Sequence, residues 1–474
     1  MGNQPILYWI RRDFRLSDNA ALSAAVQSGR PVIPVFIRDD QVDALGAAPK
    51  WRLGLGLETL EKAYNTFGSR IIYRSDSAKD VLQSLVSETG AVSVYWSRAY
   101  DPISISRDKE IKAQLSQNGI DARSFGGHVM FEPWDVSTKT GGFFRVYTPF
   151  WNAVRDRVVE TPLPAPSKIP TPDQWPKSEA LTSWTLGAQM QRGAEIVAPY
   201  LRLGEAAAQE RLNEFCASTI DNYKENRDLP SVDGTSGLSE NLALGEISPH
   251  QCWHAGFAAL RRGSRGAETF LKEVVWREFA YHLMFHTPHI LTHNWREDWN
   301  TFPWQTDENH PHVIAWKQGR TGIAFVDAAM REMYVTGRMH NRGRMIVASY
   351  LTKHLMTHWS IGQRWFDDCL VDWDPAANAM GWQWAAGSGP DAAPYFRIFN
   401  PDTQLDKFDP RGLYKSRWIA EGSPRITDTA LSYFDAIPRS WGLSPKDRYP
   451  APVVTLKDGR DRALHAYSER DRPA

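Results

Sequence analysis

Ile6-Leu7-Tyr8-Trp9-Ile10 is a continuous apolar run with the length of one buried β-strand, and it starts a pattern that repeats over the first 130 residues. Three further apolar runs predict strands at residues 32–37, 71–73 and 92–96. Apolar residues at helical spacing alternate with them at residues 52–67, 78–89 and 106–117. Alternating strands and helices predict an α/β domain, in which a doubly wound parallel sheet has helices on both faces.

The turn after the first run is Arg11-Arg12-Asp13-Phe14-Arg15, and it contains no glycine. A dinucleotide-binding βαβ unit needs Gly-x-Gly-x-x-Gly at this place, so that the backbone can approach a pyrophosphate. The turn therefore disfavours a dinucleotide-dependent dehydrogenase. The carboxyl ends of the strands still form a crevice that a ligand can occupy.

Six prolines stand between residues 160 and 176, which predicts an extended connector because proline excludes a helix or a central strand. Beyond about residue 200 the apolar residues follow long helical periodicity without a convincing strand run. A chain of 474 residues is also too long for one typical core. We expect an α/β domain over residues 1–132, an extended interdomain connector over 133–199 and an all-helical domain over 200–474.

The composition is that of an ordinary globular protein with a formal net charge of zero, so nucleic-acid binding would need a local basic face. No apolar run reaches the roughly 18 residues of a membrane-spanning helix, and the first residues lack a signal peptide and a myristoylation pattern. The three cysteines lie far apart, which argues against a disulfide framework or a cysteine-based metal site. We expect a monomeric cytoplasmic protein without a metal.

Two segments of the helical part combine groups that suit a ligand. Residues 235–239 place three hydroxyls and a glycine before a helical stretch, which suits phosphate oxygens and equally an ordinary N-cap loop. Glu273, Trp276 and Arg277 share one face of a predicted helix. Together they would hydrogen-bond and stack on a planar ligand such as a base; an ion pair beside a core tryptophan is the alternative.

A third segment, residues 339–345, is basic. Arg342, Arg344 and Lys353, with Arg331 and Arg338 nearby, concentrate positive charge without matching acids. A surface that contacts phosphates has this pattern, and so does a solvated charged face.

The most informative segment is residues 372–384. Trp382 and Trp384 stand two apart, so on a helix they point to different sides, one toward a cofactor and the other toward a substrate pocket. Asp372 and Asp374 precede them, where they can pair with Arg344 and bind polar groups of a ligand. An acidic helix cap explains the two aspartates as well, but it does not explain Asn378 and both tryptophans.

At these residues the sequence resembles the photolyase/cryptochrome superfamily, and most closely its bacterial cyclobutane pyrimidine dimer photolyases. The similarity runs from residues 9–19 to the last predicted helix around Ala463. Its most specific part is residues 341–400, which contain Gly381-Trp382-Gln383-Trp384-Ala385-Ala386 and Asp391-Ala392-Ala393-Pro394-Tyr395-Phe396-Arg397-Ile398-Phe399-Asn400.

The resemblance implies the photolyase fold, with a U-shaped FAD in the helical domain and an antenna pigment in the α/β domain. It implies three groups of site residues. The flavin would be bound by Tyr223, Thr235, Ser236, Gly237, Leu238, Ser239, Arg344, Asp372, Asp374 and Asn378, with Asn378 beside N5. The flipped-out lesion would contact Glu273, Trp276, Asn341, Arg342, Met345 and Trp384. An electron relay from the surface would consist of Trp382, Trp359 and Trp304.

The implied activity is light-driven repair of cyclobutane pyrimidine dimers in damaged DNA. Excited reduced FAD donates an electron to the dimer, the ring opens and the electron returns; side chains alone cannot supply this chemistry. Glu273 and Asn378 would stabilise the charge that develops. A dimer stacks poorly in a duplex, so flipping it out costs less than flipping an intact base.

Two other functions are compatible with the same family. A cryptochrome is a blue-light receptor without repair activity, but Asn378 stands where plant cryptochromes typically have Asp, and no signalling tail follows the family core. A (6-4) photolyase would have a histidine pair at the lesion; Met345 resembles the dimer-repair type, and His340 does not supply the pair.

The antenna pigment is left with two alternatives. Bacterial enzymes that bind 5,10-methenyltetrahydrofolate contact it with an Asn-Glu pair, which residues 100–106 lack. Either the folate binds differently here or the pigment is 8-hydroxy-5-deazaflavin; we favour the folate.

Overall fold

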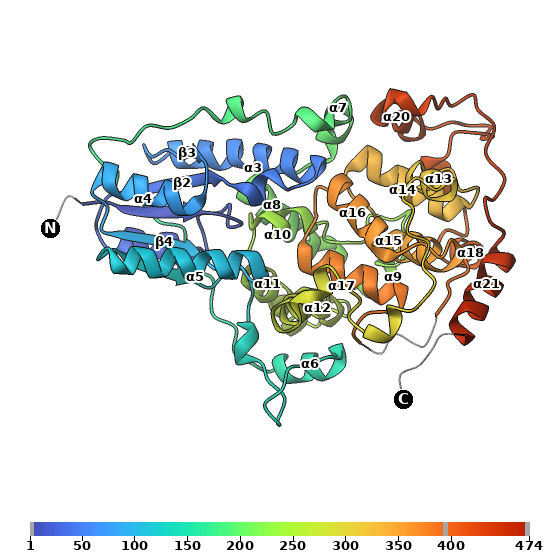
Figure 1. Cartoon of the computed structure of the whole chain (residues 1–474), viewed down its shortest axis with the longest axis horizontal. Helices are drawn as coiled ribbons and strands as arrows, with labels where there is room; N and C mark the ends of the chain where they lie inside the picture. The colour runs from blue at the N-terminus through green and yellow to red at the C-terminus, as the bar shows by residue number, and fades with distance from the viewer. Residues whose placement is uncertain (1–3, 392–396, 470–474) are drawn as a thin grey trace.

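The computed structural model of the chain describes residues 4–391 and 397–469, and it shows an α/β domain beside a helical domain (Figure 1). The first domain contains a parallel sheet of five strands in the order β3-β2-β1-β4-β5. The strands are β1 (Ile6–Ile10), β2 (Val32–Arg38), β3 (Ile72–Ser75), β4 (Ser93–Ser97) and β5 (Asp121–Phe125). The predicted parallel sheet is confirmed. Only β5 among these strands is not predicted, because its sequence, Asp-Ala-Arg-Ser-Phe, is that of a largely polar edge strand.

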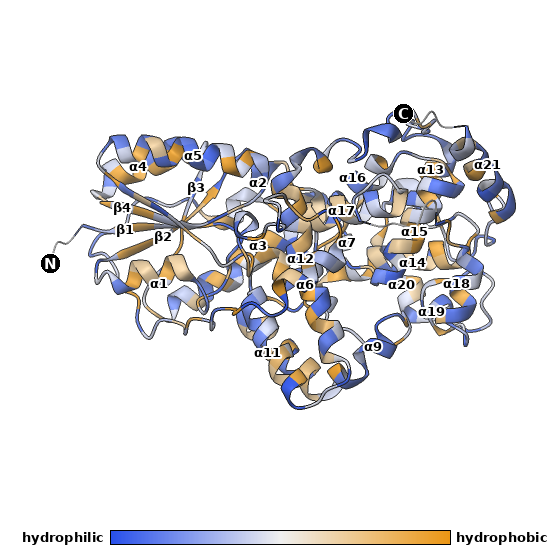
Figure 2. Ribbon diagram, turned by 90° about the horizontal axis from the view of Figure 1, so that it is seen from below, coloured by the Kyte–Doolittle hydropathy of each residue, from blue (hydrophilic) through white to orange (hydrophobic). Residues whose placement is uncertain are grey.

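Helices cover both faces of the sheet, with α1 and α3 on one side and α4 and α5 on the other (Figure 2). These helices are α1 (Ala20–Gln27), α2 (Asp40–Asp43), α3 (Ala47–Asn65), α4 (Ala78–Thr89) and α5 (Pro102–Gln117). The side chains of β1 alternate between the two cores, since Tyr8 packs against α1 and α3 while Leu7 and Trp9 pack against α4 and α5. Both faces are therefore apolar, which is why the strands read as continuous apolar runs.

The predicted bounds agree for α4 and differ for its neighbours. Helix α5 begins at Pro102, before the predicted start, because the carboxylate of Asp101 accepts the backbone N–H of Ser104 and proline suits the first helical position. Helix α3 likewise begins earlier, at Ala47. Helix α1 is not predicted; Asn19 caps it by accepting the N–H of Leu22.

The segment 133–199 is not extended throughout, in contrast to the prediction. It contains α6 (Tyr147–Val154) and α7 (Gly193–Val197), whereas residues 156–180, which include the six prolines, contain neither helix nor strand. Phe150, Trp151 and Val154 form an apolar stripe that α6 buries against the helical domain. The prediction of an extended connector rested on the proline-rich part and therefore missed this short amphipathic helix.

The predicted all-helical second domain is confirmed, and its described residues form no strand. Its helices are α8 (Gly204–Glu214), α9 (Tyr223–Asn226), α10 (Ser239–Leu244), α11 (Pro249–Arg261), α12 (Ala267–His286), α13 (Pro311–Lys317), α14 (Ala324–Thr336), α15 (Asn341–Ser349), α16 (Trp359–Cys369), α17 (Pro375–Ala386), α18 (Pro401–Phe408), α19 (Leu413–Trp418), α20 (Asp428–Ala436) and α21 (Leu456–Ser468). Across residues 4–391 and 397–469, no helix has both the length and the apolar composition that crossing a membrane requires.

The turn after β1 joins the two domains. Arg12 Nε donates a hydrogen bond to the carbonyl of Ala243 at 2.8 Å, and Arg15 Nη1 donates to the carbonyl of Gly245 at 2.9 Å. Gly245 has φ +71°, and a Cβ built on it would overlap the carbonyl of Arg12. Glycine is required here because the two backbones approach so closely. The arginine-rich turn is thus part of the interdomain contact.

Candidate functional site

The acidic segment before α17 fixes the start of that helix and its contact with α15. Asp374 caps the helix by accepting the N–H of Ala377 at 2.9 Å, and Pro375 takes the first helical position. Nη2 of Arg344 lies 2.9 and 2.7 Å from the two carboxylate oxygens of buried Asp372. The predicted pairing of Arg344 with Asp372 is present, and it joins two of the elements expected to bind a cofactor.

Asp374 is held by groups from both domains. The hydroxyl of Tyr281 on α12 lies 2.5 Å from Asp374 Oδ2, and Arg12 Nη2 lies 3.5 Å from the same oxygen. Burial raises the pKa of Tyr281, so the phenol remains protonated and donates to the carboxylate. His128, from the end of the α/β domain, contacts the same hydroxyl at 2.7 Å. The position of Asp374 therefore depends on the interdomain contact.

The amide of Asn378 has a defined orientation. Its Nδ2 donates to the carbonyl of Gln363 at 3.2 Å and to Asp367 Oδ1 at 3.1 Å, both on α16. A backbone carbonyl can only accept, so the amide nitrogen must face α16 and Oδ1 must face away from it. Among the described residues Oδ1 has no hydrogen-bond donor, and it is available to a ligand.

Asp367 beside this amide is electrostatically unusual. Burial raises its pKa to about 7, although the hydrogen bond from Asn378 acts in the opposite direction. Carboxyl groups with perturbed pKa values concentrate at functional sites. Through its hydrogen bond with Asn378, Asp367 is a further candidate for the site that was not predicted from the sequence.

The hydroxyl-rich loop at residues 235–239 is open to a ligand. Leu238 and Tyr223 are buried and anchor it, and Gly237 has φ +61°, a conformation that favours glycine. Arg211 donates to the carbonyl of Gly237 and pairs with the buried carboxylate of Glu240 at 2.9 Å. The hydroxyls of residues 235, 236 and 239 make no hydrogen bond to any described protein group.

These observations fit FAD. The free hydroxyls can donate to phosphate oxygens, as the resemblance implies for Thr235, Ser236 and Ser239. Asn378 Oδ1 presents an acceptor, and an acceptor matches an N–H group of a reduced isoalloxazine ring. The loop and the amide thus supply the two kinds of contact that the pyrophosphate and the isoalloxazine ring of FAD require.

The three tryptophans of the implied relay lie on neighbouring elements. A Cβ built on Gly362 of α16 would overlap the ring of Trp382, so that ring lies directly on α16, one turn from Trp359. Trp359 is followed outward by His358, whose ring lies 5.5 Å from that of Trp304. Trp382 and Trp359 are buried, whereas Trp304 is half-buried. The order of burial is that of a path from the interior to the surface.

Helix α12 places Glu273 and Trp276 together but directs Arg277 elsewhere. Glu273 Oε1 is paired with Arg227, and the Trp276 ring stacks on Tyr147 with centroids 3.7 Å apart. Arg277 instead donates to the carbonyl of His128 at 2.7 Å. The prediction of one three-residue ligand face was wrong for Arg277, because that guanidinium serves the contact with the α/β domain.

The remaining lesion-pocket residues come from α15 and α17, which pack on each other. Asn341 is exposed and Met345 half-buried one helical turn away, and Trp384 is half-buried on α17. Trp382 is buried in the core of the helical domain, and Trp384 packs half-buried against the same core; because they stand two positions apart on α17, they leave the helix in different directions. Whether these residues contact a lesion stays a prediction.

The basic segment is not free of acids, so the prediction of unpaired charge was wrong. Arg342 pairs with Asp228 at 2.7 Å, Arg331 with buried Glu421 at 2.6 Å, and Arg338 lies 3.5 Å from Glu240. Lys353 is buried and donates to the carbonyl of Arg397. The partners are far away in sequence, at positions 228, 240, 397 and 421, and only the fold brings them together.

A groove that contains both cations and aromatic rings nevertheless lies at Arg342. It has a volume of about 640 Å³, and its lining includes Arg342, Arg397, Lys407, Phe399 and Phe408 together with the carboxylates of Glu225 and Asp228. The Arg342 guanidinium stacks over Phe408 at 4.3 Å. Cations interleaved with aromatic rings are the groups that bind a nucleic-acid strand.

Several residues that shape the site were missed. Tyr147, Gln363 and Asp367 carry no local signal, because each acts on a partner that is distant in sequence or through its backbone. Arg12 stands in the turn after β1, which disfavours a dehydrogenase and belongs to the family resemblance, but no site role was predicted for it. Of the motif at residues 391–400, positions 392–396 lie outside the described residues.

Comparison with known proteins agrees with this geometry. Residues 6–167 match the family described as DNA photolyase, and residues 270–469 match the FAD binding domain of DNA photolyase. A deoxyribodipyrimidine photo-lyase of Agrobacterium fabrum is 43% identical over 98% of both chains. The crystal structure of a bacterial class III photolyase from Agrobacterium tumefaciens superposes with a TM-score of 0.91 at 42% identity, covering 99% of this chain and 98% of that one. Cryptochrome-1 of Arabidopsis thaliana is 32% identical over 98% of this chain and 70% of its own length.

The fold, the site and these matches define a two-domain enzyme with a FAD-binding helical domain. The chain belongs to the DNA photolyase family.

Proposed function

We propose that this enzyme repairs cyclobutane pyrimidine dimers in DNA with blue light. The proposal rests chiefly on α17, which places buried Trp382 against α16 and half-buried Trp384 on another side. A helix with one indole behind the cofactor and another in front of it suits electron supply on one side and lesion binding on the other.

FAD, when bound and reduced, supplies the single electron that opens the cyclobutane ring. Trp276 and Trp384 stack on the extruded bases. Because Arg227 occupies Glu273 Oε1, the second carboxylate oxygen remains for a donor on the lesion. Asn378 Oδ1 would accept a hydrogen bond from an N–H group of the reduced flavin, and Arg342 would contact a phosphate beside the pocket. The row Trp382, Trp359 and Trp304 would conduct electrons from an external reductant at the surface to oxidised flavin.

The lesion specificity can be tested directly. The reduced enzyme is mixed with oligonucleotides that carry a cyclobutane dimer, a (6-4) photoproduct or no lesion, in blue light and in darkness. We expect light-dependent reversal of the cyclobutane dimer alone. Reversal of only the (6-4) photoproduct would reassign the substrate, and flavin photoreduction without any repair would instead indicate a photoreceptor of the cryptochrome type.

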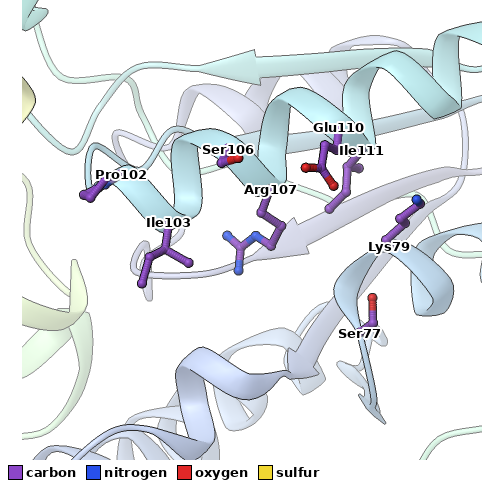
Figure 3. Close-up of a pocket in the computed structure, with 8 residues that line it drawn as sticks. All are labelled: Ser77, Lys79, Pro102, Ile103, Ser106, Arg107, Glu110 and Ile111. Carbon is purple, nitrogen blue, oxygen red and sulfur yellow. The ribbon is translucent and has the colours of Figure 1, made fainter.

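We also propose a folate antenna on the α/β domain. A groove of about 530 Å³ opens between α4 and α5, where Lys79 provides positive charge and Ile103 and Ile111 an apolar wall (Figure 3). Glu110 and Arg107 also line it, and Arg107 is paired with Asp39 and Asp108. A pterin ring with a glutamate tail has matching apolar and anionic parts. The absorption spectrum of the extracted pigment distinguishes folate from deazaflavin. Loss of the pigment, with FAD retained, in Ile103→Asp would support this location.

A further inference from the structure

The indole of Trp276 is covered on one face by a residue of the interdomain connector. Tyr147, at the first position of α6, stacks on it with ring centroids 3.7 Å apart and planes 6° apart. Helix α6 lies beside α12 in both views of the molecule (Figures 1 and 2). A parallel stack at this distance leaves no room for a base on that face of the indole.

Tyr147 is itself fixed on several sides. Its hydroxyl donates to the carbonyl of Lys272 at 2.7 Å, one helical turn before Trp276, and its ring meets Phe279 edge to face at 5.9 Å. The carboxylate of Asp391 accepts its backbone N–H at 3.3 Å. The tyrosine is only 8% exposed. The side chain therefore acts as a rigid support and not as a surface group.

We infer that Tyr147 is a positioning residue of the lesion pocket, which holds the plane of Trp276 so that only the opposite face receives an extruded pyrimidine. This inference rests on the proposed function and deepens it. A flexible indole would lose side-chain freedom on binding, whereas an indole already stacked on Tyr147 has lost it before the lesion arrives. The connector helix, which the sequence did not predict, thereby becomes part of substrate recognition.

The test compares the affinity of FAD-loaded enzyme for a dimer-containing oligonucleotide and for its undamaged counterpart. Tyr147→Leu removes the stack, and we expect about 3- to 10-fold weaker binding of damaged DNA with unchanged binding of undamaged DNA. Tyr147→Phe keeps the aromatic ring and should bind damaged DNA with the affinity of the wild type.

The matched control is Phe143→Leu, because Phe143 stacks on His286 of the same helix with planes 8° apart but does not touch Trp276. We expect that control to bind damaged DNA like the wild type. In a Trp276→Ala background, Tyr147→Leu should have no further effect, since a support has nothing left to position.

The outcomes separate the inference from the proposed function. Equal losses from Tyr147→Leu with and without Trp276 would overturn the inference, as would a Tyr147→Leu variant that discriminates like the wild type. A wild-type enzyme that does not prefer dimer-containing DNA would overturn the proposed function, and the inference with it. FAD content and a thermal melt, measured for every variant, identify any loss that comes from misfolding.

Discussion

At the scale of single residues, the site depends on which atom of a side chain is free. Asn378 illustrates this, because the carbonyl of Gln363 requires its amide nitrogen to face α16 and leaves Oδ1 without a donor among the described residues. The resemblance identifies Asn378 from the sequence. It cannot identify the orientation, which depends on a backbone atom fifteen positions away.

The raised pKa of Asp367 leads to a prediction about pH. Its value of about 7 in the folded protein lies above the ordinary 3.8, so the protonated form stabilises the fold. That contribution is complete at low pH and is lost as the pH rises from about 4 through 7. We expect Asp367→Asn, which cannot ionise, to raise the melting temperature relative to wild type at pH 8 and to have much less effect at pH 5.

The control for this prediction is Asp435→Asn, which changes an exposed carboxylate on α20, away from Asp367. It should show no such pH-dependent difference. A melting-temperature difference for Asp367→Asn that is the same at pH 5 and pH 8 would show that Asp367 does not titrate in this range.

Trp382 allows a second prediction at this scale. Trp382→Phe should slow photoreduction of oxidised flavin by an order of magnitude or more, because an electron must then reach the flavin from a more distant indole. Repair by chemically reduced enzyme should remain largely intact, since the relay does not touch the dimer. Absorption spectroscopy during illumination measures the rate of flavin photoreduction, and a single-turnover assay measures the rate of repair. Equal loss of both would remove Trp382 from the relay.

At the scale of elements, hydrophobic periodicity and composition predicted most of the strands and helices of the α/β domain. Strands β1, β2 and β4 and the first half of β3 are buried on both faces, so their apolar runs were readable, and α4 was predicted with its observed bounds. The polar edge strand β5 and the short α6 were not predicted, because each is stabilised by a tertiary neighbour. The short helix α6 buries its apolar residues against α12, and this tertiary contact cannot be seen in the sequence.

The contact between α16 and α17 gives a prediction about packing. Gly362 lies under the ring of Trp382, and an added Cβ would overlap it. We expect Gly362→Ala to destabilise the protein by about 1–3 kcal/mol through overpacking, partly offset by about 1 kcal/mol of helix propensity. Urea unfolding measures the free energy, and the displaced Trp382 should also slow photoreduction.

Gly54→Ala in α3 is the matched control, because a Cβ there would make only ordinary contact with Leu186 at 3.4 Å. It should be neutral or stabilise by up to about 1 kcal/mol. If Gly362→Ala behaved like this control, Trp382 would not be seated on α16 as described.

At the scale of the whole molecule, the two domains share buried charge beside the hydroxyl-rich loop at residues 235–239, which we propose binds the flavin. Arg52 of α3 donates to Glu246 at 3.0 and 2.6 Å and to Glu240 at 3.3 Å, and all three side chains are fully buried. Glu240 directly follows the hydroxyl-rich loop at residues 235–239 and also pairs with Arg211. The sequence could not reveal this contact, because Arg52 looks like any charged residue of a surface helix until the second domain covers it.

Removing the guanidinium should therefore affect both stability and the cofactor. We expect Arg52→Ala to cost about 3–5 kcal/mol, because it leaves Glu246 and Glu240 buried without their partner. The FAD off-rate should rise as the loop loosens. Arg52→Lys should retain little of this stability, since the single charge of lysine cannot replace a guanidinium that reaches two carboxylates.

Arg38→Ala is the control: it breaks an exposed ion pair with Asp43 inside the α/β domain and should change stability by at most about 1 kcal/mol. Adding Glu246→Gln to Arg52→Ala should recover part of the lost stability, because it removes a stranded buried charge. If that second substitution made unfolding still easier, the loss would come from packing and not from charge, and the interface would not act electrostatically on the flavin loop.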